Sequence, residues 1–247
     1  MSDDNRLIPV NFEQIPTPIP TQIGTDDQFA EITKGGDYLG RLQLYTKSKA
    51  NAKGLIPPGH YGIPESDEKI IDLGESVDLL PLARRPKAID MSDSKALVIS
   101  YDMHSKEFNR IASEADEGEP HRQFGISFLV YERSTGRFLE FFCGNKSSRI
   151  ASKQLFPFLP LKQDDIDAKS KAGKDVSDLK PHGPVPMTLK VNLAENRHGS
   201  WHVPVVARCS IPFTCVPSEE LLAAEITKFL TISDNGLEKA TKGTTAK

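Results

Sequence analysis

The segment Met187–Ile211 constrains the fold more than any other stretch, because it has the alternating pattern of a β-hairpin. Apolar residues at positions 187, 189, 191 and 193 alternate with polar or small ones, and a second alternation runs from Trp201 to Ile211. A period of two over this length is typical of half-buried strands, and Asn196 and Gly199 favour a turn between them. The sequence therefore predicts two antiparallel strands, with the single tryptophan of the chain at the start of the second.

Short segments with strand character recur along the chain, and two of them form a second hairpin pattern. The predicted strands are Gly40–Thr46, His60–Ile63, Lys69–Leu73, Ser76–Ala83, Ala96–Tyr101, Phe124–Glu132 and Arg137–Cys143. Apolar spacing and capping residues predict helices within Ser105–Ala115, within Gly144–Leu159 and directly after Ser218. The sequence thus predicts a mainly β protein, namely an OB-like, partly closed antiparallel barrel with one or two short helices and a C-terminal helix.

Changes in composition divide the chain into four parts. Residues 1–36 contain prolines 16, 18 and 20 between acidic flanks. They predict an acidic arm, which is either a solvated tail, a competitor of nucleic acid for the protein's own basic surface, or a dock for a partner. Residues 37–216 are the predicted single barrel domain, with a mobile polar insertion at 162–186. A C-terminal helix at 217–232 and a flexible tail at 233–247 follow.

Composition restricts the compartment and the class of protein. No apolar run approaches the roughly 20 residues of a membrane-spanning helix, and the start of the sequence lacks the pattern of a secretory signal. The cysteines are odd in number and show no paired spacing: Cys143, Cys209 and Cys215. They predict free thiols in a reducing cytoplasm rather than a disulfide framework.

The net charge of −3 is unfavourable for nucleic-acid binding when the chain is taken as a whole. Residues 1–31, however, hold one cation (Arg6) and six acidic residues, a balance of −5 that leaves the rest of the chain near +2. Local fields decide whether a polyanion can dock. The charge distribution therefore permits nucleic-acid binding without requiring it.

Known catalytic and metal-binding patterns are missing from the sequence. His198, His202 and Cys209 lack the close pairs of a zinc site. Asp90, Asp93 and Asp102 could form a two-metal nuclease cluster, but their spacing matches no such motif. The sequence therefore predicts a protein without catalytic residues, metal or cofactor.

Cations and aromatic residues recur at strand ends, as a single-strand binder requires. Each group has an ordinary alternative: a solvated lysine loop at 47–53, edge protection by the segment ARRPKA at 83–88, and core packing for aromatics, Trp201 included. The predicted stacking residues are Tyr45, Tyr61, Phe142 and Trp201. The predicted phosphate contacts are Arg41, Lys47, Lys49, Lys53, Arg84, Arg85, Lys87, Lys146, Arg149, Lys190 and Arg197.

The segment LKVNLAENRHGSWHVPVV is similar to the late hairpin of phage-type single-stranded DNA-binding proteins, in which a polar turn leads into an aromatic residue, then proline and valine. GDYLGRLQLY and GRFLEFFCGNKSSR also resemble phage and prophage proteins that hold such domains. The resemblance implies an OB-fold that coats DNA without sequence preference. Many members end in an acidic tail, whereas this chain ends LEKATKGTTAK and has its acidic segment at the other terminus.

Three functional hypotheses follow. The first is a sequence-independent single-stranded DNA-binding protein that protects replication or recombination intermediates, in the bacterial host cytoplasm if phage-encoded. Its partners would be single-stranded DNA and, through the acidic arm, replication or recombination proteins. The protein could form a homo-oligomer, and we expect no membrane partner. The alternative is a non-catalytic structural or regulatory interaction protein of a phage or mobile element. The third is a metal-dependent nicking enzyme that uses Asp90 or Asp102.

Overall fold

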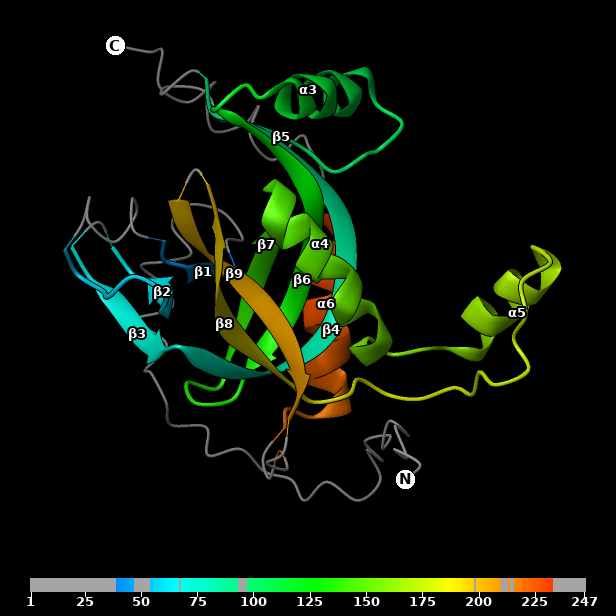
Figure 1. Cartoon of the computed structure of the whole chain (residues 1–247). Helices are drawn as coiled ribbons and strands as arrows, with labels where there is room; N and C mark the ends of the chain where they lie inside the picture. The colour runs from blue at the N-terminus through cyan, green and yellow to red at the C-terminus, as the bar shows by residue number, and fades with distance from the viewer. Residues whose placement is uncertain are drawn as a thin grey trace, which may run out of the picture.

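One long, curved β-sheet forms the body of the protein (Figure 1). The computed structural model describes residues 39–46, 54–66, 68–92, 97–197, 199–209, 213 and 216–232. Within them the sheet has nine strands in the order β3-β2-β1-β7-β6-β4-β8-β9, with β5 paired to β4. The strands are β1 (Gly40–Leu44), β2 (Tyr61–Pro64), β3 (Ile70–Gly74), β4 (Ser76–Asp90), β5 (Val98–Ser100), β6 (Arg122–Glu132), β7 (Arg137–Cys143), β8 (Met187–Asn196) and β9 (Gly199–Arg208).

The mainly β prediction is confirmed, whereas the barrel is corrected in two respects. The sheet is not closed into a barrel, since β3 and β9 are its two ends. In addition, β1 pairs parallel to β7, while the other pairs are antiparallel. β1 comes from the start of the described chain and pairs with a strand almost a hundred residues later, so no hairpin turn imposes its direction.

Strand β4 runs to Asp90, well beyond the predicted end at Ala83, and connects the two halves of the sheet. It pairs with β6 along residues 79–90, with β8 at 76–79 and with β5 at 88–90. Between β8 and β5 one edge of β4 has no partner strand in the described chain. The Met91 N–H donates a hydrogen bond to the His121 carbonyl oxygen, just before β6. Backbone N–H groups alternate between the two edges of a strand, so the nitrogen at position 86 faces the other, open edge. Pro86 therefore sacrifices no ladder hydrogen bond.

The curvature brings both ends of the sheet onto one core. Tyr61 on β2, Leu79 on β4 and Leu189 on β8 are buried in the same cluster, which helix α4 covers through Leu155. The Tyr61 hydroxyl donates a hydrogen bond to the Lys190 carbonyl oxygen at 3.2 Å. This contact links β2 to β8, two strands that are not neighbours in the sheet.

The described residues form four α-helices, one more than predicted: α3 (Lys106–Glu117), α4 (Lys146–Leu155), α5 (Gln163–Lys171) and α6 (Glu219–Thr231). A short 3-10 helix, η2 (Phe156–Phe158), follows α4. α4 and α6 lie on opposite faces of the sheet (Figure 1). α6 is the expected C-terminal helix, and the Ser218 hydroxyl caps it by accepting a hydrogen bond from the Leu221 N–H.

Helix α5 lies in the polar stretch 162–186 that the sequence predicts as a mobile insertion. It projects away from the sheet in Figure 1, and a bridge between Leu161 and His182 joins the two ends of the excursion. Only Ile166 is buried along α5. The helix therefore has no apolar stripe, which is the signal on which helix prediction depends.

Several predicted features lie outside the described residues: the arm at 1–36, the loop with Lys47, Lys49 and Lys53, and the tail at 233–247. None of the helices in the described part of the chain combines the length and apolarity needed to cross a membrane.

Candidate nucleic-acid interface

Two of the predicted stacking residues are core residues. Tyr45 is 3% exposed and packs against Ile56 in the loop before β2. Tyr61 is completely buried, and burial raises the pKa of its hydroxyl far above the ordinary value. The stacking prediction is therefore wrong for both. Loop and strand neighbours cover the two rings, and the alternating pattern alone does not show which face of a strand such neighbours cover.

Arg85 and Lys87 are also buried, contrary to the prediction of phosphate contacts. We call the group Arg85, Lys87, Ser127 and Glu140 the buried charge cluster. Lys87 Nζ lies 2.5 Å from Glu140 Oε2, and Arg85 Nη2 lies 3.6 Å from Glu140 Oε1. The Ser127 hydroxyl donates to Glu140 Oε1 at 2.6 Å, and the parallel register of β1 places Arg41 beside Glu140. The carboxylate thus sits among three cations.

The buried charge cluster joins the sheet to α6. Arg85 Nη1 donates a hydrogen bond to the Phe229 carbonyl oxygen at 2.6 Å, at the helix end where carbonyls carry partial negative charge. The Arg85 guanidinium lies between two rings, 3.7 Å from the centroid of Tyr101 and 4.2 Å from that of Phe229. Lys87 Nζ is 5.4 Å from the ring of Phe142, which is half-buried. These cations stabilise the fold from inside.

The shifts in pKa within the pair follow from burial and from the partner charge. Burial lowers the pKa of Lys87 below its ordinary value, although Glu140 opposes the change. Burial alone would raise the pKa of Glu140, but the attraction and hydrogen bond of Lys87 outweigh it and the pKa is lowered. The cluster therefore keeps Glu140 ionised at neutral pH.

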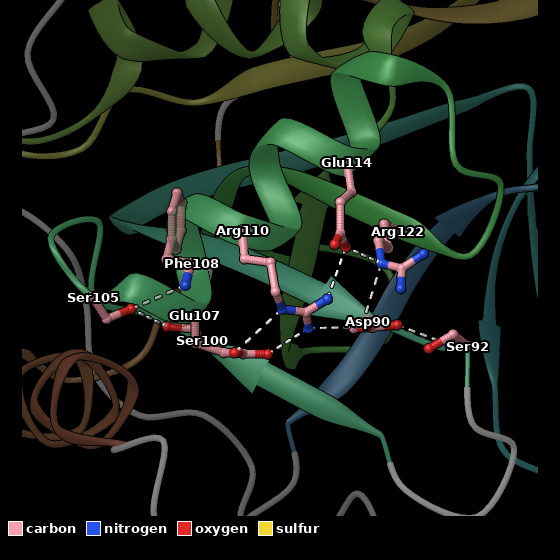
Figure 2. Close-up of polar contacts among 9 residues, drawn as sticks. All are labelled: Asp90, Ser92, Ser100, Ser105, Glu107, Phe108, Arg110, Glu114 and Arg122. Carbon is pink, nitrogen blue, oxygen red and sulfur yellow. Dashed lines mark hydrogen bonds and ion pairs between the residues drawn. The ribbon is translucent and has the colours of Figure 1, made fainter.

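A second charge network holds α3 on the sheet, and Figure 2 shows its contacts. Asp90 Oδ2 accepts a hydrogen bond from Arg110 Nη2 at 2.9 Å and lies 3.4 Å from Arg122 Nε. Burial would raise the pKa of Asp90, but the hydrogen bonds from Ser92 and Arg110 outweigh it, so its pKa lies well below the usual range. Asp102 accepts the His104 N–H in a local turn.

These contacts bear on the nuclease hypothesis. Asp90 is engaged by two arginines, and Asp93 lies outside the described residues. Within the described ranges, no three His, Cys, Asp or Glu side chains gather as metal ligands would.

The basic window from Arg133 to Lys153 is largely neutralised by acidic residues from elsewhere in the chain. Arg133 pairs with Asp78 at 3.2 Å, Arg137 with Glu65 at 3.0 Å and Arg149 with Asp116 at 2.9 Å. Arg149 also lies 4.0 Å above the ring of Phe124. Lys146 begins α4. A linear count of charge overstated this surface because the partner acids are distant in sequence.

The outer hairpin face is where predicted residues remain accessible. We use this name for Thr188, Lys190, Asn192, Ala194, Trp201, Val203, Val205 and Ala207. Their register pairs Lys190 with Val205 and Ala194 with Trp201, while Leu189 and Val206 point into the core on the other face. Trp201 is 36% exposed and Lys190 is exposed, as is Arg197 in the turn. Core packing, the ordinary alternative for Trp201, is therefore wrong.

Phe156 is a surface residue that the sequence patterns above do not single out. It is 36% exposed at the end of α4, and the guanidinium carbon of Arg84 lies 4.1 Å from its ring centroid. The segment FPF offered one signal, since a proline opposes continuation of a helix and so predicts that the helix ends near Phe156.

The structure thus separates the predicted site into three sets. Lys190, Arg197 and Trp201 share one hairpin, Arg84 lies beside Phe156, and the buried residues belong to the core. Known protein families, curated proteins and solved structures provide no match to this chain.

Proposed function

We propose that this protein binds single-stranded DNA without sequence preference, on the outer hairpin face. The observation that carries the proposal is the partly exposed indole of Trp201, which shares a face with the exposed cation Lys190. Ala194 lies directly opposite Trp201 and has only a methyl side chain, which leaves one side of the indole open to a ligand. Arg197 adds a second exposed cation at the turn.

Physical chemistry favours a single strand as the ligand. A base can stack on an indole only when its own face is uncovered, and stacking of this kind contributes roughly 1–3 kcal/mol per base. Every base has such a face, so the contact is tolerant of sequence. Lys190 and Arg197 would neutralise phosphates, and Val203 and Val205 provide an apolar floor beside the indole.

This proposal includes an OB-like mode of binding, in which a strongly curved sheet carries an oligonucleotide across its strands and the loops act as clamps. The resemblance of the hairpin to phage-type single-stranded DNA-binding proteins favours intermediates of replication or recombination as the DNA. The acidic arm would then contact replication or recombination proteins.

Fluorescence titration tests the proposal directly, because Trp201 is the only tryptophan. We expect oligo-dT to quench the emission, and the logarithm of affinity to fall with the logarithm of salt by about 0.7 per phosphate contacted. Trp201→Ala should weaken binding in a gel shift by about tenfold. Unchanged emission at low salt, or equal binding of duplex DNA, would contradict the proposal.

Matched variants isolate the face that binds. Trp201→Phe should retain most of the affinity, since a smaller ring still stacks. Lys190→Gln should reduce the salt slope by about 0.7, the share of one phosphate. Lys171→Gln, at an exposed position on the remote helix α5, should leave binding unchanged. Oligo-U in place of oligo-dT reports whether RNA is bound as well.

A second function, an interaction protein without DNA binding, is favoured by one feature of α6. Leu221 is 42% exposed and Leu230 is 53% exposed, although the same helix buries Leu222 and Phe229 against the sheet. A defined oligomer on sizing that Leu230→Ser dissociates, in a protein that ignores oligo-dT, would favour this function.

A further inference from the structure

We propose that Arg84 and Phe156 form a second contact for the same single strand, in which the ring supports the stacked guanidinium and the guanidinium binds a phosphate. The inference rests on the proposed function and extends it by giving the bound strand a direction, from Trp201 along β9 to the end of α4.

The charge of Arg84 distinguishes it from five arginines of the described residues that are neutralised by acidic groups. Arg110, Arg122, Arg133, Arg137 and Arg149 each pair with a carboxylate. Arg84 is exposed and forms no ion pair with any residue that the structure describes. Its guanidinium carbon lies 4.1 Å from the ring centroid of Phe156. A stacked guanidinium keeps its N–H groups at the edge of the plane, where they can form a bidentate contact with phosphate.

Phe156 is held firmly at the surface. It ends α4 and begins η2, with Pro157 directly after it. Its ring centroid lies 6.1 Å from that of the buried Phe128, which anchors one side of the ring to the core. The side chain is nevertheless 36% exposed. Phe128 thus fixes one side of the ring and the Arg84 guanidinium lies over the ring at 4.1 Å, so the guanidinium is held in place and loses little conformational freedom when a phosphate binds it.

The two contacts are within reach of one strand of DNA. The Val206 N–H of β9 donates a hydrogen bond to Gln154 Oε1 at 3.2 Å, which ties β9 to the last turn of α4, two residues before Phe156. Trp201 precedes Val206 by five residues, about 17 Å at the usual rise of a strand. Phe156 packs on Phe128, on the opposite face of the sheet from Trp201, so a single strand that leaves Trp201 along β9 reaches Phe156 and Arg84 by crossing the edge of β9 beside α4.

A length series separates this inference from the proposed function. Trp201 emission is titrated with oligo-dT of about 4 and about 16 nucleotides, the range of site sizes for a domain of this kind. For Arg84→Gln and Phe156→Ala we expect unchanged affinity for the short oligonucleotide. For the long one we expect a loss on the order of tenfold and, in Arg84→Gln, a salt slope shallower by about 0.7.

The matched control is Arg149→Gln. Arg149 also lies above a phenylalanine ring, at 4.0 Å, but its charge is already paired with Asp116. This variant should bind both lengths as the unmodified protein does. A charge reversal, Arg84→Glu, should weaken the long oligonucleotide more than Arg84→Gln does, and thermal unfolding should show that all variants remain folded.

The outcomes distinguish the two ideas. If both lengths quench Trp201 and the Arg84 and Phe156 variants bind the long oligonucleotide normally, the second contact is refuted and the proposed function stands. Equal weakening at both lengths also refutes it. If neither length quenches Trp201 in the unmodified protein, the proposed function itself fails.

Discussion

Lys87 is only 2% exposed and rests against Glu140, which is 7% exposed. Two opposite charges out of water are tolerated when each satisfies the other, whereas an uncompensated buried charge is strongly destabilising. The Ser127 hydroxyl and the Arg85 guanidinium complete the surroundings of the carboxylate. At the scale of single residues, these four side chains therefore act as one unit rather than as separate contributors.

A double-mutant cycle tests this interdependence. Glu140→Gln should lower the free energy of unfolding by about 3–5 kcal/mol, because it leaves the ammonium of Lys87 buried without a counter-charge. The double variant Lys87→Met, Glu140→Leu should lose much less than the sum of the losses of Lys87→Met and Glu140→Leu made separately. Urea unfolding followed by circular dichroism measures both quantities, and strictly additive losses would show that the pair is not coupled.

At the scale of elements, helix α4 positions one of the two candidate contacts, Phe156. Helix α4 begins at Asn145, whose Oδ1 accepts the Ser148 N–H at 2.8 Å while Ser148 Oγ accepts the Asn145 N–H at 3.1 Å. The same helix ends at Phe156. The cap thus stabilises the N-terminus of the helix that carries Phe156 at its other end.

Removal of this cap should have a measurable cost. Asn145→Ala should lower the free energy of unfolding by about 0.5–2 kcal/mol, since an orphan backbone N–H loses its acceptor. Asn145→Asp should retain most of the stability, because a carboxylate oxygen accepts the same hydrogen bond and favours the helix N-terminus. Chemical denaturation compares the three proteins, and equal losses in both variants would exclude capping as the cause.

For the whole molecule, ionised carboxylates hold the layers together. Asp90 ties α3 to β4 and β6 through Arg110 and Arg122, and Glu140 lies in the cluster that joins α6 to the sheet. Both carboxylates have a lowered pKa in the folded protein. A lowered folded pKa contributes stability that is present above the unfolded pKa and is lost as pH falls through the folded value.

Stability should therefore fall as pH drops below about 4, where unfolded Asp and Glu take up protons. Asp90→Asn should cost about 1.5–3 kcal/mol at neutral pH, the contribution of hydrogen bonds to a charged group. The difference from the unmodified protein should shrink steadily in acid. Asp102→Asn, at an exposed turn position, should show little effect at any pH. Thermal melts at a series of pH values give the comparison, and a difference independent of pH would contradict the assignment.

Local patterns in the sequence determined the elements themselves. Alternation located the β8–β9 hairpin, and Ser105 and Ser218 marked the starts of α3 and α6. These signals depend on residues within a few positions of one another, so the chain carries them before it folds. The helix α5 lacked such a signal and was missed.

Only the tertiary structure decided which of two faces each side chain occupies. Alternation predicts that Arg84 and Arg85 point to opposite sides of β4, but not that the Phe229 carbonyl, 144 positions later, meets Arg85. Burial and ion pairing are set by neighbours distant in sequence, such as Lys190 for Tyr61. The sequence by itself therefore determined that strands, cations and one tryptophan were available, and the fold decided that, among the described residues, Trp201, Lys190, Arg197 and Arg84 are exposed.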